Sequence, residues 1–368
     1  MLLSETNLST YGGYCRRLRL KQKRIFALAT VLAIALAATS AVAQRYNQTN
    51  IVSDIPGLAI TTDPNLKNAW GIAFGPGNPI WIADNGTGLS TLYDGAGNII
   101  PLVVTIPAPA TGDTSAPTGL VVNPSGDFVV TKDGKSGPSI FIFDTEDGTI
   151  VGWSPAVDMT NGVIAVPNSH GAIYKGLAIA KTAKGTFLYA ANFHDRVVEI
   201  YDAHFKFRGS FSDPSLPPRY APFGIQNING QLFVTFAEQD ALKEDEVAGP
   251  GHGFVDVFDT SGHLVRRFAS RGTLNAPWGL ALAPSTFGKF AGDILVGNFG
   301  DGRISAFDPT SGAFLGQLRN NTGQILSIDG LWALTPGGGA GTTPDDVLFT
   351  AGPNDEANGL FGKLNPVP

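Results

Sequence analysis

The chain lacks the residues on which disulfide-rich folds and multi-cysteine metal sites depend. Its single cysteine, Cys15, excludes a disulfide framework as well as a zinc or iron–sulfur site built from several thiolates. Charged residues account for only 15% of the 368 residues and hydrophobic residues for 43%, which excludes disorder throughout. The 46 glycines and 25 prolines favour tight turns over long helices and argue against an all-helical fold.

Sequence signatures of common catalytic sites are missing as well. The five histidines form no His-x-x-x-His or His-Glu-x-x-His pair, so a zinc-protease motif is absent. No Gly-x-Ser-x-Gly nucleophile elbow occurs. The glycine-rich stretch 337–341 lacks the Lys-Ser or Lys-Thr that completes a phosphate-binding loop. The sequence therefore leaves open whether the protein is an enzyme.

Residues 1–43 have the order of a secretory signal peptide. Six basic residues between positions 16 and 24 precede an apolar run over 25–38, and Ala41-Val42-Ala43 follows. This pattern predicts cleavage before Gln44 and a secreted, periplasmic or extracellular protein without a stable membrane anchor. The alternative is an uncleaved anchor, because residues 25–43 are just long enough to span a bilayer. The Ala-x-Ala triplet favours cleavage.

Removal of this segment makes the protein strongly acidic. The remaining residues 44–368 carry 19 basic and 30 acidic side chains, a formal net charge of −11. Such a surface repels phosphate backbones and anionic lipids. We therefore expect no nucleic-acid partner.

An internal repeat gives the strongest indication of the fold. A glycine followed by a short apolar run recurs six times at spacings of 48 to 57 residues, at Gly71, Gly119, Gly176, Gly224, Gly279 and Gly330. Further short runs rich in aromatic and β-branched residues follow each glycine, as expected for β-strands. Four strands in each of six repeats predict an all-β, six-bladed β-propeller that forms one domain over residues 44–368. We expect it to be a monomer.

The last repeat is one strand short. It offers strand-like runs at 331–334, 347–351 and 360–364 and then ends. The segment Tyr46–Ser53 precedes the first repeat and also has strand character. We predict that it pairs with the third strand of the last repeat, closes the ring and removes an exposed sheet edge.

Several segments resemble a known group of proteins. The segment 58–73 and the stretch Gly249–Asp259 are similar to an uncharacterised family of exported bacterial propellers related to NHL-repeat proteins. Many members of that family end in a PEP-CTERM sorting tail, whereas this chain ends in Lys363–Pro368 without one. The resemblance implies a propeller fold and export, with release rather than surface anchoring. It implies no established activity.

Propeller topology predicts which residues share a face. The segments before each first strand and the turns after each second strand should surround one mouth of the central channel. We expect the ligand-binding residues there, at Asn68, Trp70, His170, Tyr174, His194, Asp195, Glu238, Asp240, Asn275 and Trp278. Asp94, Asp144, Asp202, Asp259 and Asp308 should follow third strands on the opposite face and stabilise turns.

Some of these residues have two interpretations. Trp70 and Trp278 occupy matching repeat positions, where they either stack on a ligand or pack between adjacent blades. The charged segment Glu238–Glu246 is either a solvated loop or a lid over the binding face. Calcium prefers carboxylate and amide oxygens, and a calcium site would use Asn192, Asn298 and Asp329.

Two classes of function remain. The first is a non-catalytic binding or interaction scaffold for an extracytoplasmic protein, glycan or small ligand. The alternative is a divalent-metal-dependent hydrolase or lactonase with its site at the channel mouth. The scaffold is favoured, because no catalytic constellation stands out from ordinary turn chemistry.

Overall fold

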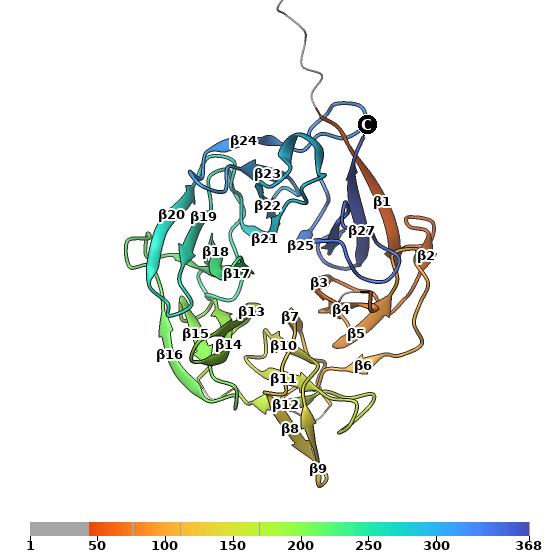
Figure 1. Ribbon diagram of the computed structural model, residues 1–368, viewed down its shortest axis with the longest axis vertical. Helices are drawn as coiled ribbons and strands as arrows, with labels where there is room; N and C mark the ends of the chain where they lie inside the picture. Colours follow the sequence, from red (N-terminus) through yellow and green to blue (C-terminus); the bar gives the residue numbers. More distant parts are fainter. Residues whose placement is uncertain (1–43, 76, 111, 169, 368) are drawn as a thin grey trace, which may run out of the picture. The chain divides into compact units, whose positions relative to one another are not determined.

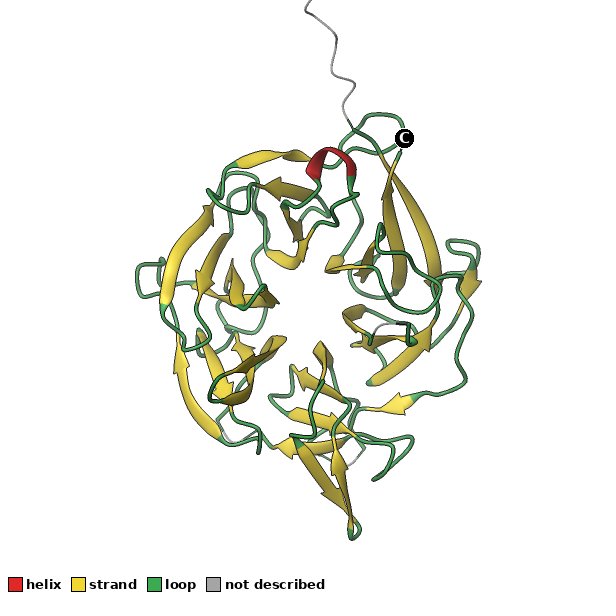
Figure 2. Ribbon diagram, viewed as in Figure 1, coloured by secondary structure: helices red, strands yellow, loops and turns green. Residues whose placement is uncertain are grey.

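Strands make up nearly all the regular structure of the computed structural model, which describes residues 44–75, 77–110, 112–168 and 170–367 (Figure 2). One short 3-10 helix, η1 (Gly288–Phe290), interrupts blade five. The signal peptide predicted over residues 1–43 lies outside the described residues. Among the described residues, no helix has the length and hydropathy needed to cross a membrane.

The strands form six radial sheets around a central axis (Figure 1). Blade one contains β3 (Ala69–Ala73), β4 (Ile80–Asp84), β5 (Leu89–Tyr93) and β6 (Val104–Thr105). Blade two contains β7 (Pro117–Val122), β10 (Phe141–Thr145), β11 (Ile150–Trp153) and β12 (Val163–Val166). Blade three contains β13 (Tyr174–Thr182), β14 (Gly185–Asn192), β15 (Val197–Tyr201) and β16 (Phe207–Phe211).

The second half of the ring repeats this order. Blade four contains β17 (Tyr220–Ile228), β18 (Gln231–Glu238), β19 (Phe254–Phe258) and β20 (Leu264–Ser270). Blade five contains β21 (Pro277–Leu282), β22 (Ile294–Asn298), β23 (Ile304–Phe307) and β24 (Phe314–Gln317). Blade six contains β25 (Leu331–Pro336), β26 (Val347–Ala351), β27 (Leu360–Pro366) and β1 (Tyr46–Ser53). The predicted six-bladed β-propeller is confirmed.

The first strand of the described chain completes the last blade. β1 pairs antiparallel with β27, from Tyr46 opposite Pro366 to Ser53 opposite Leu360. The short strand β2 (Thr61–Thr62) then pairs with β1 in parallel and extends the same sheet. The predicted closure of the ring by Tyr46–Ser53 is therefore confirmed.

Apolar side chains fill the spaces between the blades. Within the described residues, six buried clusters lie one at each contact between neighbouring blades, and a seventh lies in the channel. The innermost strands of adjacent blades contact one another around the whole ring. The fold is thus held together by repeated sheet-to-sheet packing, with the channel mouth at the meeting point of all six blades.

Crowding of these innermost strands explains the repeated glycines. A Cβ on Gly224 would lie 2.2 Å from the carbonyl oxygen of Trp278, and one on Gly279 would lie 2.5 Å from that of Trp332. In blade six the equivalent residue is Ala333. A Cβ on Gly279 would contact the two chain neighbours of Ala333, Trp332 and Leu334, just as the other glycines face the next innermost strand. The sequence-based choice of Gly330 was therefore wrong by three positions, although the number of blades was right.

This crowding leads to a first prediction. Gly224→Ala should lower the free energy of unfolding by about 1–3 kcal/mol, because backbone rather than a flexible side chain must move to accept the methyl group. Gly126→Ala is the matched control, since nothing lies within 4 Å of a Cβ at that position. Urea unfolding of both variants measures the difference. Equal stability of the two would contradict the crowding argument.

Blade two departs from the expected strand order. A hairpin of β8 (Val129–Lys132) and β9 (Lys135–Pro138) is inserted between its first and second strands and projects from the ring (Figure 1). The strand that ends near Asp144 is therefore the second of the blade, so the placement of Asp144 on the opposite face was wrong. Asp144 is buried and accepts hydrogen bonds from the Thr118 hydroxyl and the Gly119 amide. Consequently the turn after β10 lies at the channel mouth.

Candidate functional site at the channel mouth

Six equivalent residues, one from each innermost strand, surround the mouth. They precede the crowded glycines and Ala333, and they are Trp70, Thr118, Lys175, Phe223, Trp278 and Trp332. The Trp70 and Trp332 rings stack with centroids 3.5 Å apart, and the Trp278 ring meets both edge-on at 6.0 and 5.9 Å. Phe299 stacks on Trp332 at 4.1 Å. Aromatic side chains thus close the channel just below its mouth.

Lys175 is the one charged residue in this ring. Its side chain is only 2% exposed, and its ammonium lies 5.5 Å from the centre of the Trp70 ring. Nζ forms an ion pair with Glu146 and lies 3.3 Å from Asp245 Oδ1. Burial alone would lower the pKa of Lys175, but Glu146, Glu246 and Asp245 outweigh it and raise the pKa above its usual value. The ammonium is therefore permanently charged.

Two asparagines hold the carboxylates around this ammonium. Asn85 Nδ2 donates to Glu146 Oε2 at 2.8 Å, and Asn68 Nδ2 donates to Glu356 Oε2 at 2.6 Å. Asn68 also accepts a hydrogen bond from the Trp332 indole at 3.0 Å, which couples the polar layer to the aromatic one. The orientation of these groups is therefore fixed by neutral partners from other blades.

The carboxylates outnumber the ammonium. Glu146, Asp245, Glu246 and Glu356 all act electrostatically on Lys175 or on one another. Burial raises the pKa of Glu246 to about 8, and burial also raises the pKa of Glu356. A single lysine leaves this group of acids with too little positive charge. The mouth is therefore a site that favours an additional cation.

Strained backbone brings one of these acids into place. Asn354, Asp355 and Glu356 have φ of 59°, 51° and 63°, and Asn68 has φ of 46°. Each residue other than glycine in this region costs on the order of 1 kcal/mol and persists only where the surroundings enforce it. The side chains of the cluster are thus held in a defined arrangement.

The structure brings together some of the residues predicted for the ligand face. Asn68, Trp70 and Trp278 lie at the mouth. Trp70 and Trp278 both pack against Trp332 of the blade between theirs, so they contact adjacent blades, as in the second of the two interpretations, and they do so inside the channel. His170 and Tyr174 lie elsewhere, in a pocket between blades two and three.

The charged segment of blade four reaches the mouth. Asp240 Oδ1 accepts a hydrogen bond from the Glu244 amide at 3.0 Å and shapes the loop that delivers Asp245 to Lys175. This supports the interpretation of Glu238–Glu246 as a loop that covers the binding face. Glu238 itself pairs with Nδ1 of His252 at 3.1 Å.

Asn192, predicted as a calcium ligand, already has partners in its own blade. Its Nδ2 donates to Asp195 Oδ2 at 3.0 Å and to Glu199 Oε1 at 2.9 Å. His194 and Asp195 lie in the turn that follows β14. These hydrogen bonds assign a turn-stabilising role to Asn192.

The other two predicted calcium ligands are also engaged locally. Asn298 Oδ1 accepts a hydrogen bond from the Asn275 amide at 3.2 Å, and Asp329 Oδ2 accepts one from the Asn354 amide at 2.9 Å. The described residues contain no group of three or more His, Cys, Asp or Glu side chains arranged for one metal ion. Calcium at Asn192, Asn298 and Asp329 stays a prediction.

Sequence reasoning missed the centre of the site. Lys175, Glu146, Glu356 and Trp332 were not among the predicted residues, and Glu246 was included only as the end of the charged segment Glu238–Glu246. Lys175 carried a usable signal, because it directly precedes Gly176 just as Trp70 precedes Gly71. A lysine at a repeat position that holds tryptophan in blades one and five marks a polar group placed on the channel axis.

The fold and this mouth define the class of protein as a six-bladed β-propeller with a plugged channel. Soluble aldose sugar dehydrogenase of Escherichia coli has a TM-score of 0.54 and 13% identity, covering 88% of this chain and 100% of that one. Virginiamycin B lyase of Staphylococcus aureus has a TM-score of 0.51 and 12% identity, with the same coverage of 88% and 100%. At these identities the likeness shows the fold alone.

Sequence comparison identifies the family more narrowly, although no protein-family model matches the chain. Uncharacterized protein R648 of Acanthamoeba polyphaga mimivirus is 35% identical over 325 residues, which cover 85% of this chain and 78% of R648. Uncharacterized protein L690 of the same virus is 34% identical over 325 residues, which cover 85% of this chain and 84% of L690. The chain belongs to the family of these two proteins. Since these relatives are viral, they do not support the predicted bacterial origin.

Proposed function

We propose that the protein is an exported, non-catalytic binding protein that docks a cationic segment of a partner protein on its channel mouth. The observation that carries this proposal is the excess of carboxylates around Lys175. Four acids from blades two, four and six face a single buried ammonium. A lysine or arginine side chain of a partner would supply the missing positive charge.

The exposure of the acids makes such docking feasible. The Asp245 side chain is 74% exposed and the Glu146 side chain 27% exposed, so both can be reached from solvent. The net charge of −11 over residues 44–368 would also steer positively charged partners toward the protein. Partner charge near Glu246 and Glu356 would favour their ionised forms and thereby release protons on binding.

The rigidity of the mouth supports binding rather than turnover. The polar groups are held by neutral amides and lie on a layer of stacked tryptophans. A preorganised surface of this kind loses little entropy when a partner docks. Export rests on the signal peptide predicted over residues 1–43.

Tetralysine peptide provides a defined probe for this proposal. Isothermal titration calorimetry should detect binding at low ionic strength that weakens as salt is added. The double variant Asp245→Asn/Glu356→Gln should bind about tenfold more weakly, because it removes two charges from the mouth while leaving the Glu146–Lys175 pair.

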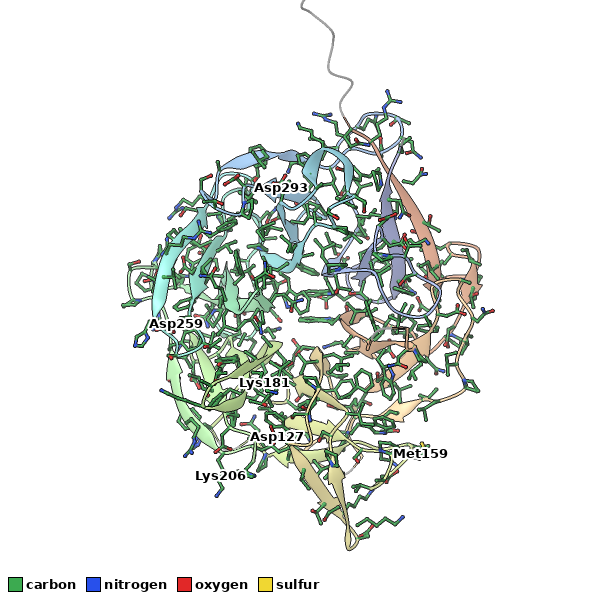
Figure 3. The ribbon with its side chains drawn as sticks, viewed as in Figure 1. Asp127, Met159, Lys181, Lys206, Asp259 and Asp293 are labelled. Carbon is green, nitrogen blue, oxygen red and sulfur yellow. The ribbon has the colours of Figure 1, made fainter. Side chains whose placement is uncertain are left out.

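A matched control separates the mouth from the net charge. Asp259→Asn/Asp308→Asn removes the same number of charges from turns at the opposite ends of their blades, and Asp259 lies far from the channel axis (Figure 3). This control should stay within about twofold of the unmodified protein. An equal loss in both double variants would show that binding follows only the overall charge and would refute the proposal.

A further inference from the structure

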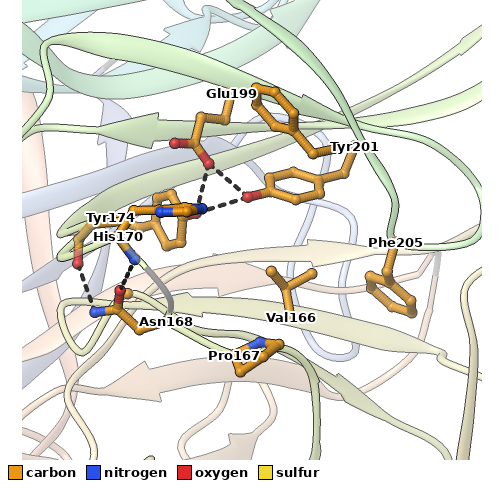
Figure 4. A pocket seen from close by; sticks show the side chains of 11 residues that line it. Val166, Pro167, Asn168, His170, Tyr174, Glu199, Tyr201 and Phe205 are labelled. Atoms are coloured by element: carbon orange, nitrogen blue, oxygen red, sulfur yellow. Dashed lines mark hydrogen bonds between the residues drawn. The ribbon is translucent and has the colours of Figure 1, made fainter.

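A separate pocket of about 250 Å³ lies between blades two and three (Figure 4). Its walls are largely aromatic and apolar, formed by Tyr174, Tyr201, Phe205, Phe207 and Val166. One water molecule occupies about 30 Å³ of liquid, so the pocket has room for a small organic molecule of roughly one ring and a short chain. The side chain of Phe207 is part of the wall although the residue is 57% exposed.

One end of this pocket is a triangle of oxygen atoms. The Tyr174 and Tyr201 hydroxyls lie 2.7 and 2.6 Å from the same carboxylate oxygen, Glu199 Oε2, and 2.9 Å from each other. The second carboxylate oxygen accepts the hydrogen bond from Asn192. Figure 4 shows that the three side chains meet at one side of the cavity.

The number of protons makes this triangle a hydrogen-bond acceptor. Burial, together with the Glu199 charge, raises the pKa of both tyrosines, so each phenol keeps its single proton at neutral pH. An ionised carboxylate has no proton to donate. Three oxygens therefore share two protons across three close contacts. A donor from a ligand would supply the third proton that the triangle lacks.

The charge of the site further restricts the class of ligand that it can bind. In the described part of the chain, no lysine, arginine or histidine side chain forms an ion pair with Glu199. Its negative charge is stabilised by three neutral donors alone. A positively charged donor would gain a charge-assisted hydrogen bond that a neutral donor lacks. Aromatic walls next to that position also favour an organic cation.

We propose that this pocket binds a small primary amine with an aromatic or similarly compact apolar body. The ammonium donates to the Tyr174–Glu199–Tyr201 triangle, and the apolar body packs on Phe205 and Phe207. This site is independent of the channel mouth, because none of its lining residues belongs to the Lys175 cluster.

Three ligands of nearly equal size test the proposal on the purified protein. Calorimetry and ligand-observed NMR should show that phenethylamine binds, that phenethyl alcohol binds at least about tenfold more weakly, and that phenylacetate does not bind. Absence of phenethylamine binding up to millimolar concentration overturns the proposal. Phenylacetate binding as tightly as the amine also overturns it.

Two variants locate the binding. Glu199→Gln should weaken phenethylamine at least about tenfold but change phenethyl alcohol by less than about threefold, because only the charged ligand depends on the carboxylate charge. Phe207→Ala, at an exposed position that the fold tolerates, should weaken both ligands alike. Amine binding that survives both variants, or that is lost instead in Asp245→Asn/Glu356→Gln, would place the amine elsewhere and refute the proposal.

Discussion

Removal of Tyr46–Ser53 should abolish cooperative folding of the propeller. β1 supplies the fourth strand of blade six, and Tyr46, Ile51 and Val52 are at most 1% exposed. Loss of one such large buried side chain costs about 2–5 kcal/mol, and the whole stability of a domain is about 5–15 kcal/mol. The deletion also leaves β27 with an unpaired edge. We expect no thermal transition of the native kind, and aggregation in size-exclusion chromatography.

Two point variants in β1 test how the loss of stability depends on the burial of the side chain that is removed. Ile51→Ala removes a fully buried side chain between blades six and one and should lower the free energy of unfolding by about 2–5 kcal/mol. Gln48→Ala changes an exposed side chain of β1 and should leave the melting midpoint nearly unchanged. A protein without Tyr46–Ser53 that stays monomeric and keeps its melting midpoint would show that β1 does not hold the ring closed.

The repeat revealed the fold because backbone crowding recurs at one position of each blade. Gly71, Gly119, Gly224 and Gly279 each face backbone atoms of the next innermost strand at less than 3 Å from an added Cβ. Such a contact makes any side chain costly, so glycine recurs at that spacing. In blade six this position is occupied by alanine, Ala333. The search for a recurring glycine therefore selected Gly330 instead.

Blade two shows where spacing misleads. Asp144 follows Asp94 by 50 residues, as an equivalent third-strand residue would. The inserted β8–β9 hairpin nevertheless makes β10 the second strand of its blade. Because of the two inserted strands, the strand that ends near Asp144 is the second of its blade rather than the third. The distance from Asp94 to Asp144 nevertheless stays close to one repeat length. Only the pairing of β10 with β7 and β11 shows that β10 is the second strand. The turn after β10, which contains Glu146, therefore lies at the channel mouth.

The side-chain cluster at the mouth could not be predicted from the sequence, and the reason is different. Lys175 pairs with Glu146 and Asp245 across three blades, and no repeat spacing indicates which loop reaches the axis. Glu356 arrives through three consecutive positive φ values without a glycine. Local sequence patterns encode strands and turns, whereas these contacts depend on how neighbouring blades meet.

The second large effect should come from Lys175→Met. The substitution keeps the apolar stem but removes the ammonium, and Glu146, Asp245, Glu246 and Glu356 then lose their common partner. Removing one partner of a buried ion pair typically costs about 3–5 kcal/mol. Lys132→Met is the matched control, because Lys132 forms its ion pair with Asp158 at the surface. Urea unfolding at pH 8 should show a large loss for Lys175→Met and a much smaller one for Lys132→Met.

The loss should depend on pH in a defined direction. Glu246 has a folded pKa of about 8 against an ordinary value of 4.5, so its protonated form stabilises the native state below pH 4.5 and this contribution disappears as the pH rises through 8. The pKa of Glu356 is also raised, so its contribution to stability is likewise lost as the pH rises. Lys175 lowers the pKa of both acids, so its removal raises their pKa further and makes ionisation in the folded state more costly. The stability difference between Lys175→Met and the unmodified protein should therefore be small near pH 5 and grow as the pH rises through 8. A difference that is constant with pH, or that grows on acidification, would show that Lys175 does not balance the charge of these carboxylates.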